Sequence, residues 1–301
     1  MEAPVMRLVA GVAVLTLLAV LAGAAAPPPL WDKLGARVAE VERRLDGVLG
    51  LSVRDVASGT VLEIRATEDF PAASTIKVAI LYELFRQADE GRIDLAEITR
   101  PPLPRVGGGG VLQELSDRVA LTWRDLAVLM IGWSDNEAAN RLADKVGMDA
   151  VEKRMTVLAL PGVRLRRKMM DLEAARRGFE NTATARELRR LMDTVWEGTG
   201  LTPARAADLR QVAATAESYS DIRAALPEGT KAITKSGELT GVRAEAAYVD
   251  LPGRPYSVAV MTKFLRRDTE GASAIREISA ILYDTFDRLA RSSEHGRILS
   301  D

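Results

Sequence analysis

Hydrophobic positions recur at helical spacing in three segments of the chain. Apolar and charged residues alternate at a helical period over residues 34–45, which predicts an amphipathic helix. The same period starts at Ser74 and runs to just before Gly91, a residue type that commonly follows a helix. Apolar residues at helical spacing across 275–289 predict a closing helix.

Strand patterns fall into two groups, one early and one late. Residues 51–56 and 61–64 alternate around a glycine turn and predict a β-hairpin. Three further strands are predicted late in the chain: 232–234, 247–249 and 256–261.

The middle of the chain has mainly helical signals. A capping box at residues 122–125 opens a helix that reaches Met130. Residues 136–146 predict a second helix, and Thr182 or Thr184 opens a third. The order of these segments predicts the fold class α+β, in which a sheet with packed helices carries an inserted helical lobe.

These segments set the expected domain organisation. We expect a single domain over residues 34–301, with an all-helical lobe at about 95–225 and a linker at 25–33. A run of four glycines at 107–110 lacks the Lys-Ser/Thr that follows it in a P-loop, so it predicts a mobile loop.

The first residues of the chain resemble a leader for export. Arg7 precedes an apolar run at 8–21, and small residues in an A-x-A pattern follow, so residues 1–24 predict a signal peptide cleaved near Ala24. An uncleaved membrane anchor is the alternative, although the run is shorter than the roughly 20 residues that a spanning helix needs. Both interpretations place the body of the protein outside the cytoplasm, in the periplasm or secreted.

Composition excludes several kinds of chemistry. The 301 residues include no cysteine and one histidine, His295, near the C-terminal end. Thiol nucleophiles, Cys-rich zinc sites and iron–sulfur clusters are therefore excluded, and a His-ligated zinc site would lack its ligands. A net charge of -1 gives no reason to expect nucleic acid as a partner. We expect no metal and no cofactor, and proton transfer that depends on lysines and carboxylates.

A serine and a lysine at one helix start form the first candidate for chemistry. Ser74 and Lys77 lie three residues apart and share a helix face, so the amine of Lys77 can hydrogen-bond to the Ser74 oxygen. The free N–H groups of a first helical turn suit an oxyanion. Such a serine is activated without histidine, although Ser74 could also be a plain helix cap.

Two more motifs follow in order along the chain. Residues 134–136 read Ser-Asp-Asn between two predicted helices, and residues 235–237 read Lys-Ser-Gly at the end of a predicted strand. Each is compatible with an ordinary capping turn or strand end when taken alone. Three such motifs in this order and context are much less probable as accidents.

The set S-x-x-K, S-D-N and K-[ST]-G resembles that of the class A β-lactamase-like serine hydrolases. The resemblance extends over about residues 34–289 and implies an antiparallel sheet built from the N- and C-terminal segments. It implies that Ser74 is the acylated nucleophile and that Lys77 is its proton-transfer partner. Ser134 would relay a proton to the leaving lactam nitrogen.

The resemblance also implies the residues that bind substrate. Their expected roles are an amide contact from Asn136, carboxylate contacts from Lys235 and Ser236, a place beside the substrate for Gly237, and an oxyanion hole made by the backbone N–H groups of Ser74 and Glu238. Arg243, on the neighbouring strand, either helps to hold the carboxylate or is a solvated strand residue.

The sequence departs from the family at the loop that activates the hydrolytic water. The family pattern is E-x-x-L-N, and aligning Leu172 with its leucine places Met169 at the glutamate and Glu173 at the asparagine. Methionine cannot act as a base. Asp171 or Glu173 could replace the glutamate if the loop is reshaped, and both could equally be solvated surface carboxylates.

Three functional hypotheses follow from the resemblance. The first is a class A-type β-lactamase that opens β-lactam rings through a Ser74 acyl-enzyme, with a role in antibiotic resistance. The second is a penicillin-binding peptidase or esterase, acting on peptidoglycan-stem-like substrates, that acylates but deacylates slowly. The third is a non-catalytic cell-wall-binding relative, which the intact motif residues argue against. We expect a monomer with a small-molecule substrate.

Overall fold

The computed structural model describes residues 29–100, 105–215, 219–293 and 295–299. The signal sequence predicted for residues 1–24 lies outside this part of the chain. None of the helices in the described ranges is long and apolar enough to cross a membrane.

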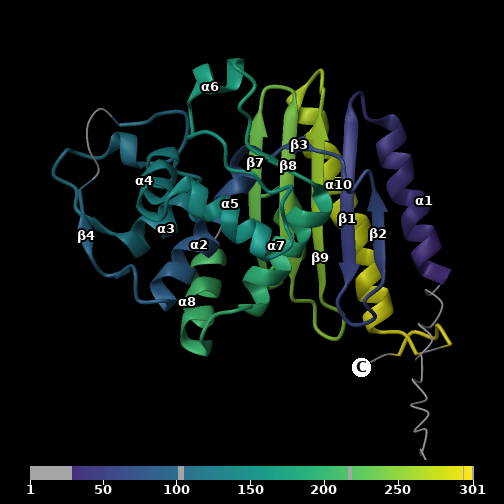
Figure 1. Ribbon diagram of the computed structural model, residues 1–301. Helices are drawn as coiled ribbons and strands as arrows, with labels where there is room; N and C mark the ends of the chain where they lie inside the picture. Colours follow the sequence, from purple (N-terminus) through teal and green to yellow (C-terminus); the bar gives the residue numbers. More distant parts are fainter. Residues whose placement is uncertain (1–28, 101–104, 216–218, 294, 300–301) are drawn as a thin grey trace, which may run out of the picture.

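A five-stranded antiparallel sheet forms the centre of the molecule (Figure 1). Its strands, in spatial order, are β2 (Val61–Ile64), β1 (Val48–Asp55), β9 (Tyr256–Lys263), β8 (Val242–Val249) and β7 (Ala232–Leu239). The early hairpin joins the three late strands because β1 pairs with β9 over its whole length, from Val48 opposite Lys263 to Asp55 opposite Tyr256. The predicted sheet from both terminal segments is confirmed, and β7 is left at one edge.

Strands β7 and β8 are longer than the sequence predicted. Residues 235–239 continue β7 and residues 242–246 begin β8, with a tight turn at Gly241, whose φ is 75°. Polar and small residues interrupt the apolar pattern here, which hid the strand from a reading of hydrophobicity. The Lys-Ser-Gly motif therefore lies within β7.

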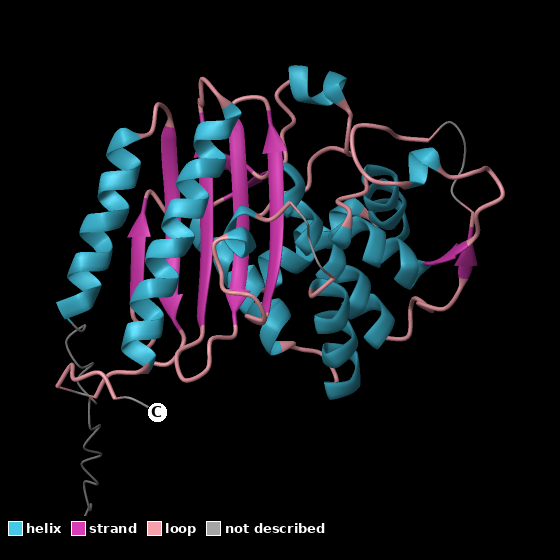
Figure 2. Cartoon of the chain, turned by 180° about the vertical axis from the view of Figure 1, so that it is seen from behind, coloured by secondary structure: helices cyan, strands magenta, loops and turns pink. Residues whose placement is uncertain are grey.

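Two long helices cover one face of the sheet, in front of it in Figure 2. These are α1 (Pro29–Arg44) and α10 (Asp268–Ala290). Trp31 of α1 is buried, and its ring meets the Phe286 ring of α10 edge-on at 5.8 Å between centroids. Residues 29–33, predicted as linker, therefore form the first turns of α1, because Trp31 is part of this core.

The opposite face of the sheet is covered by α7 (Ala185–Glu197), which packs against β1, β8 and β9. Beyond the β7 edge lies a group of helices, to the left in Figure 1: α2 (Lys77–Asp89), α3 (Trp123–Gly132), α4 (Asn136–Val146), α5 (Met148–Val157) and α8 (Pro203–Ala213). The shorter elements are β3 (Phe70–Pro71), η1 (Ala73–Ile76), β4 (Ile98–Thr99), η2 (Leu112–Glu114), β5 (Leu121–Thr122), α6 (Leu172–Arg176), β6 (Thr182–Ala183) and α9 (Asp221–Ala224).

Capping signals located α3, α4 and α7, whereas α5 and α8 were not predicted. The predicted capping box at Thr122 is present, with Asp125 N donating to Thr122 Oγ1 at 3.0 Å. The helix predicted at 136–146 matches α4. At α7, however, the cap is Thr184, because Thr182 pairs with Pro71 in a short strand.

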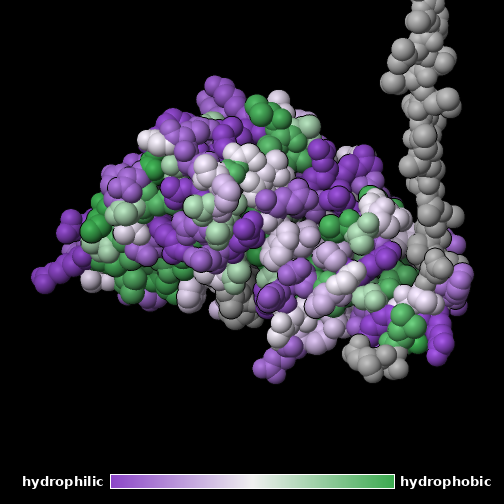
Figure 3. Space-filling model, turned by 90° about the horizontal axis from the view of Figure 1, so that it is seen from below, coloured by the Kyte–Doolittle hydropathy of each residue, from purple (hydrophilic) through white to green (hydrophobic). Residues whose placement is uncertain are grey.

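The face drawn in Figure 3 is mostly hydrophilic, with hydrophobic residues in separate patches between polar ones. The buried apolar side chains form two clusters, one on each side of the sheet. The cluster beneath α7 continues into the helical group and surrounds α2. The start of α2 is therefore supported by the largest core of the protein.

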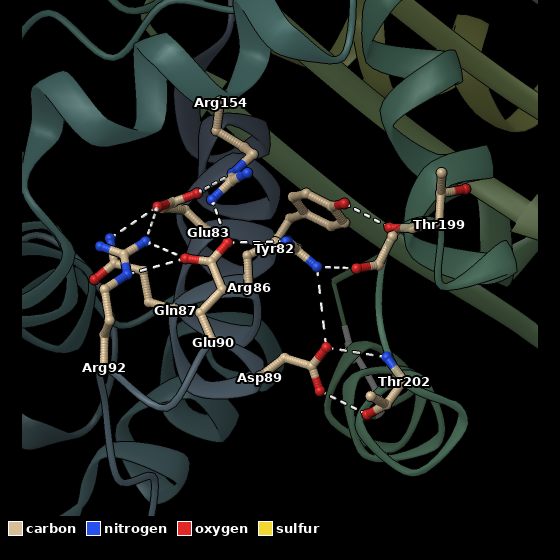
Figure 4. Close-up of polar contacts among 11 residues, drawn as sticks. Tyr82, Glu83, Arg86, Gln87, Asp89, Glu90, Arg92, Arg154, Thr199 and Thr202 are labelled. Carbon is tan, nitrogen blue, oxygen red and sulfur yellow. Dashed lines mark hydrogen bonds and ion pairs between the residues drawn. The ribbon is translucent and has the colours of Figure 1, made fainter.

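A group of polar contacts fixes the C-terminal half of α2 (Figure 4). The Glu83 carboxylate, 1% exposed, accepts a hydrogen bond from Arg154 Nε of α5 at 2.7 Å. The Tyr82 hydroxyl donates to Thr199 O at 2.6 Å and so joins α2 to the segment before α8. These bonds orient the helix whose first residue is Lys77.

We expect Arg154→Ala to lower the free energy of unfolding by about 2–4 kcal/mol, because it leaves the buried Glu83 carboxylate without its main partner. Urea unfolding measures the difference. Arg92→Ala is the matched control: Arg92 is half exposed and lies 3.7 Å from Glu83, so we expect a loss below about 1 kcal/mol. Equal losses in the two variants would contradict the role of the buried pair.

Candidate active site

The three sequence motifs meet at one cavity of about 340 Å³. It lies between the start of α2, the turn before α4, the edge strand β7 and the loop at residues 165–172. The motif residues that line it are Ser74, Ser134, Asn136, Ser236 and Gly237. The part of the chain that the structure describes contains no group of three or more acidic or histidine side chains placed to hold a metal ion.

Ser74 lies in a 3-10 turn rather than at the start of an α-helix. The turn is η1, and α2 begins only at Lys77. The residues at the cap positions of η1 and α2 are Ala72 and Ile76, so the interpretation of Ser74 as a plain helix cap is wrong. The turn is fixed by Ala72, whose N–H donates to Asn181 O at 2.8 Å. The half-buried Ser74 side chain is thereby presented to the cavity.

Lys77 connects the first motif to the second. Its side chain is fully buried, and its Nζ donates to Ser134 O at 2.6 Å, to Ser134 Oγ at 3.1 Å and to Asn136 Oδ1 at 2.9 Å. An amine that contacts a serine hydroxyl on the far side of the cavity can pass protons to it. The sequence predicted Lys77 near Ser74, and the structure adds this link to Ser134.

The glycine run forms a wall of the cavity. Asp135, which caps α4, accepts hydrogen bonds from Val111 N at 2.7 Å and Leu112 N at 2.8 Å. A Cβ atom on Gly110 would lie 2.2 Å from Asp135 Oδ2, so only glycine allows the chain to pass here. Asn136 Nδ2 donates to Gly107 O at 3.1 Å. The segment predicted as a mobile loop is packed on the Ser-Asp-Asn turn.

Glycine is also required where β7 meets Ser74. A Cβ atom on Gly237 would lie 2.6 Å from Ser74 N and 3.0 Å from Thr75 N. The missing side chain lets the open edge of β7 lie against η1, with Lys235 buried behind it. Lys235 Nζ donates to Ser236 O at 3.0 Å.

Several residues with a strained, left-handed backbone conformation line this cavity. Ala73, Ser134 and Met170 all have positive φ, at 47°, 51° and 64°, and all three line the cavity. Left-handed backbone is uncommon for residues other than glycine, and it concentrates at functional sites where the surroundings enforce it.

Arg243 lies at the cavity and takes part in two ion pairs. Its side chain is 14% exposed, and it pairs with Asp221 at 2.8 Å and with Glu238. The interpretation of Arg243 as a solvated strand residue is therefore wrong. Sequence reasoning missed Asp221, which belongs to no motif and comes 22 residues before its partner.

The loop at 165–172 places Met169 in the cavity wall. The Asn140 side chain clamps its backbone, since Met169 N donates to Asn140 Oδ1 at 2.7 Å and Asn140 Nδ2 donates to Met169 O at 3.1 Å. Sequence reasoning missed Asn140. Its position one helical turn after Asn136 was a signal that could have identified it.

The two loop carboxylates predicted as candidates for water activation are used elsewhere. Asp171 Oδ1 accepts a hydrogen bond from Ala174 N at 2.9 Å and caps α6. Glu173 is 65% exposed and pairs with Arg176 at 2.9 Å. Neither is among the residues that line the cavity. Glu180 does line it and is paired with Arg167 at 2.7 Å.

Comparisons with known proteins agree on one family. The profile of the beta-lactamase enzyme family matches residues 33–286. A beta-lactamase of Streptomyces cellulosae is 30% identical over 238 residues, which are 75% of each chain.

Solved structures give the same result. The chain matches a beta-lactamase from Sphaerobacter thermophilus with a TM-score of 0.77 and 29% identity, over 85% of this chain and 97% of the other. It also matches a mutant of PBP-A, described as an acyl-enzyme complex with penicillin G, with a TM-score of 0.77 and 28% identity, over 87% and 99% of the two chains.

Proposed function

The chain belongs to the beta-lactamase enzyme family and is a hydrolase of the beta-lactamase type, and from this premise we propose that it opens β-lactams by acylation of Ser74 and releases the acyl group slowly. One observation carries this proposal. The acylation motifs meet at one cavity, while the loop that should supply the water-activating carboxylate contributes an arginine, two methionines and a leucine to it, and no carboxylate.

Acylation requires Lys77 in its neutral amine form, which takes the proton of Ser74 Oγ. The oxygen then attacks the lactam carbonyl, and the backbone N–H groups of Ser74 and Glu238 stabilise the oxyanion. As the intermediate collapses, the C–N bond breaks and the ester bond to Ser74 remains. The nitrogen takes a proton from Ser134, which Lys77 replenishes across their 3.1 Å contact.

Substrate is held on both sides of the nucleophile. We assign the substrate carboxylate to the β7–β8 side, where Ser236 and Arg243 line the cavity and Lys235 lies behind them. Asn136 lies on the opposite wall, where its amide can bond to the acyl amide of the substrate.

Deacylation needs a base beside the ester to activate water. Met169 lies in the cavity wall that the loop at residues 165–172 forms, and its side chain has no acid–base chemistry. The acyl-enzyme is therefore expected to persist, and this argues against a large role in antibiotic resistance, which requires turnover. A rapidly turning-over beta-lactamase is the second candidate, supported by the names of the relatives. Cell-wall peptide stems are alternative acyl donors for the slow enzyme.

A chromogenic cephalosporin separates these two candidates. Mixed in excess with the wild-type enzyme, it should give a colour burst of one equivalent per protein, followed by a very slow steady rate, because each active site stays acylated. Steady turnover without a burst would contradict slow release and identify a working beta-lactamase.

We further propose that the enzyme acts outside the cytoplasm as a monomer with a single domain over residues 34–301. The leader-like pattern of residues 1–24 supports export. On the face that Figure 3 shows, polar residues separate the hydrophobic patches, and this supports a monomer.

A further inference from the structure

Arg243, on the side of the cavity that we assign to the substrate carboxylate, is already paired with a carboxylate of the protein, that of Glu238. Glu238 of β7 and Arg243 of β8 lie opposite each other in the strand pairing, and both line the cavity. Glu238 is paired with Nη1 of Arg243, and its side chain is 72% exposed.

The other edge of the guanidinium is bound by a buried carboxylate. Asp221 Oδ2 accepts hydrogen bonds from Arg243 Nε at 3.0 Å and Nη2 at 2.8 Å. Asp221 is 2% exposed and also pairs with Arg276 at 2.8 Å. A ligand in the cavity must therefore approach Arg243 through Nη1, where Glu238 is bound.

The two carboxylates on Arg243 are not equivalent. The position of Asp221 is fixed through its backbone, because its N–H donates to the buried Glu245 carboxylate at 2.9 Å. Displacing it would take one of two arginine partners from a buried carboxylate, which is costly. Glu238 is exposed, and breaking an exposed ion pair costs little because water replaces the partner. Glu238 is thus the carboxylate that a ligand can displace.

We propose that Glu238 is a specificity-determining residue that competes with the substrate carboxylate for Arg243. A substrate that carries an anion at this position must displace Glu238, whereas a substrate that is neutral there leaves the pair intact. The inference rests on the proposed function, which assigns the substrate carboxylate to Ser236, Lys235 and Arg243.

Glu238→Gln tests the proposal with two probes, penicillin G and its methyl ester, which differ only in the carboxylate charge. We expect the ratio of acylation efficiencies, penicillin G over its methyl ester, to rise about three- to tenfold in Glu238→Gln, because only the acid has to displace the Glu238 side chain. Comparing the two probes within each variant cancels any effect of the substitution on the oxyanion hole. The matched control is Glu68→Gln, which removes an exposed carboxylate paired with Lys263 of β9, outside the cavity lining.

Binding in a Ser74→Ala background makes the test independent of acylation. Calorimetry should show tighter binding of penicillin G when Glu238→Gln is added and no tightening with Glu68→Gln. If this holds while the Ser74 protein is never acylated, the proposed function fails and the role of Glu238 stands. If acylation occurs but Glu238→Gln leaves the acid-to-ester ratio within twofold, the competition is overturned. Absence of any penicillin G binding would overturn it as well.

Discussion

Ser74→Ala is expected to lower the rate of covalent labelling by penicillin G by at least about 10⁴-fold, because it removes the hydroxyl that we assign as the acylated nucleophile. Intact-protein mass spectrometry of the wild type and the variant, exposed to penicillin G for the same time, measures this difference. Since Ser74 is half-buried in a turn fixed by backbone hydrogen bonds, the variant should fold normally.

Ser273→Ala is the matched control for this experiment. Ser273 is an exposed serine on α10 whose hydroxyl donates to Thr269 O. It is not among the residues that line the cavity, so its loss should leave labelling unchanged. Thermal unfolding of both variants shows whether each is folded. Equal labelling of Ser74→Ala and wild type would end the assignment of Ser74 as nucleophile.

Met169→Glu is expected to speed release of the penicilloyl group from Ser74 by about 10²–10⁴-fold, the usual contribution of a positioned general base. The Asn140 clamp holds position 169 through its backbone, so the loop can keep its course with a new side chain. The Met169 side chain is 9% exposed, and such burial would raise the pKa of a carboxyl group placed there, as suits a base. The decay of the acyl-enzyme mass after removal of free penicillin gives the rate.

Met169→Gln is the control for this gain, because glutamine has the length of glutamate and no basic group. Its acyl-enzyme should decay as slowly as that of the wild type. If Met169→Glu is folded and acylated normally but releases no faster than Met169→Gln, the missing carboxylate is not the reason for slow release.

Local signals in the sequence predicted the parts of the site that depend on neighbouring residues. The helix at 136–146 was found because its cap and its closing glycine lie within the same short segment. The three motifs were found because their chemistry is carried by residues one to three positions apart. Their meeting at one cavity followed from the resemblance, and the structure shows it.

Pairs that are distant in the sequence could not be predicted in this way. Asn140 clamps a residue 29 positions away, and Asp221 holds Arg243 across 22 positions. Neither contact leaves a periodic or local trace, since single polar residues in a helix or loop are usually solvated. Competition between local signals was equally hidden. Thr182 is a good helix cap by type, but its backbone pairs with Pro71 and exchanges hydrogen bonds with Arg164, which makes it a strand residue.

The central claim is that Ser74 is acylated and stays acylated. Its most direct test is peptide-level mass spectrometry of the wild-type protein after brief exposure to penicillin G and removal of the free antibiotic. We predict one added penicillin per protein, on the peptide that contains Ser74, still present after many minutes. Unmodified protein alongside fully hydrolysed penicillin would contradict the claim, and so would an adduct on any other residue.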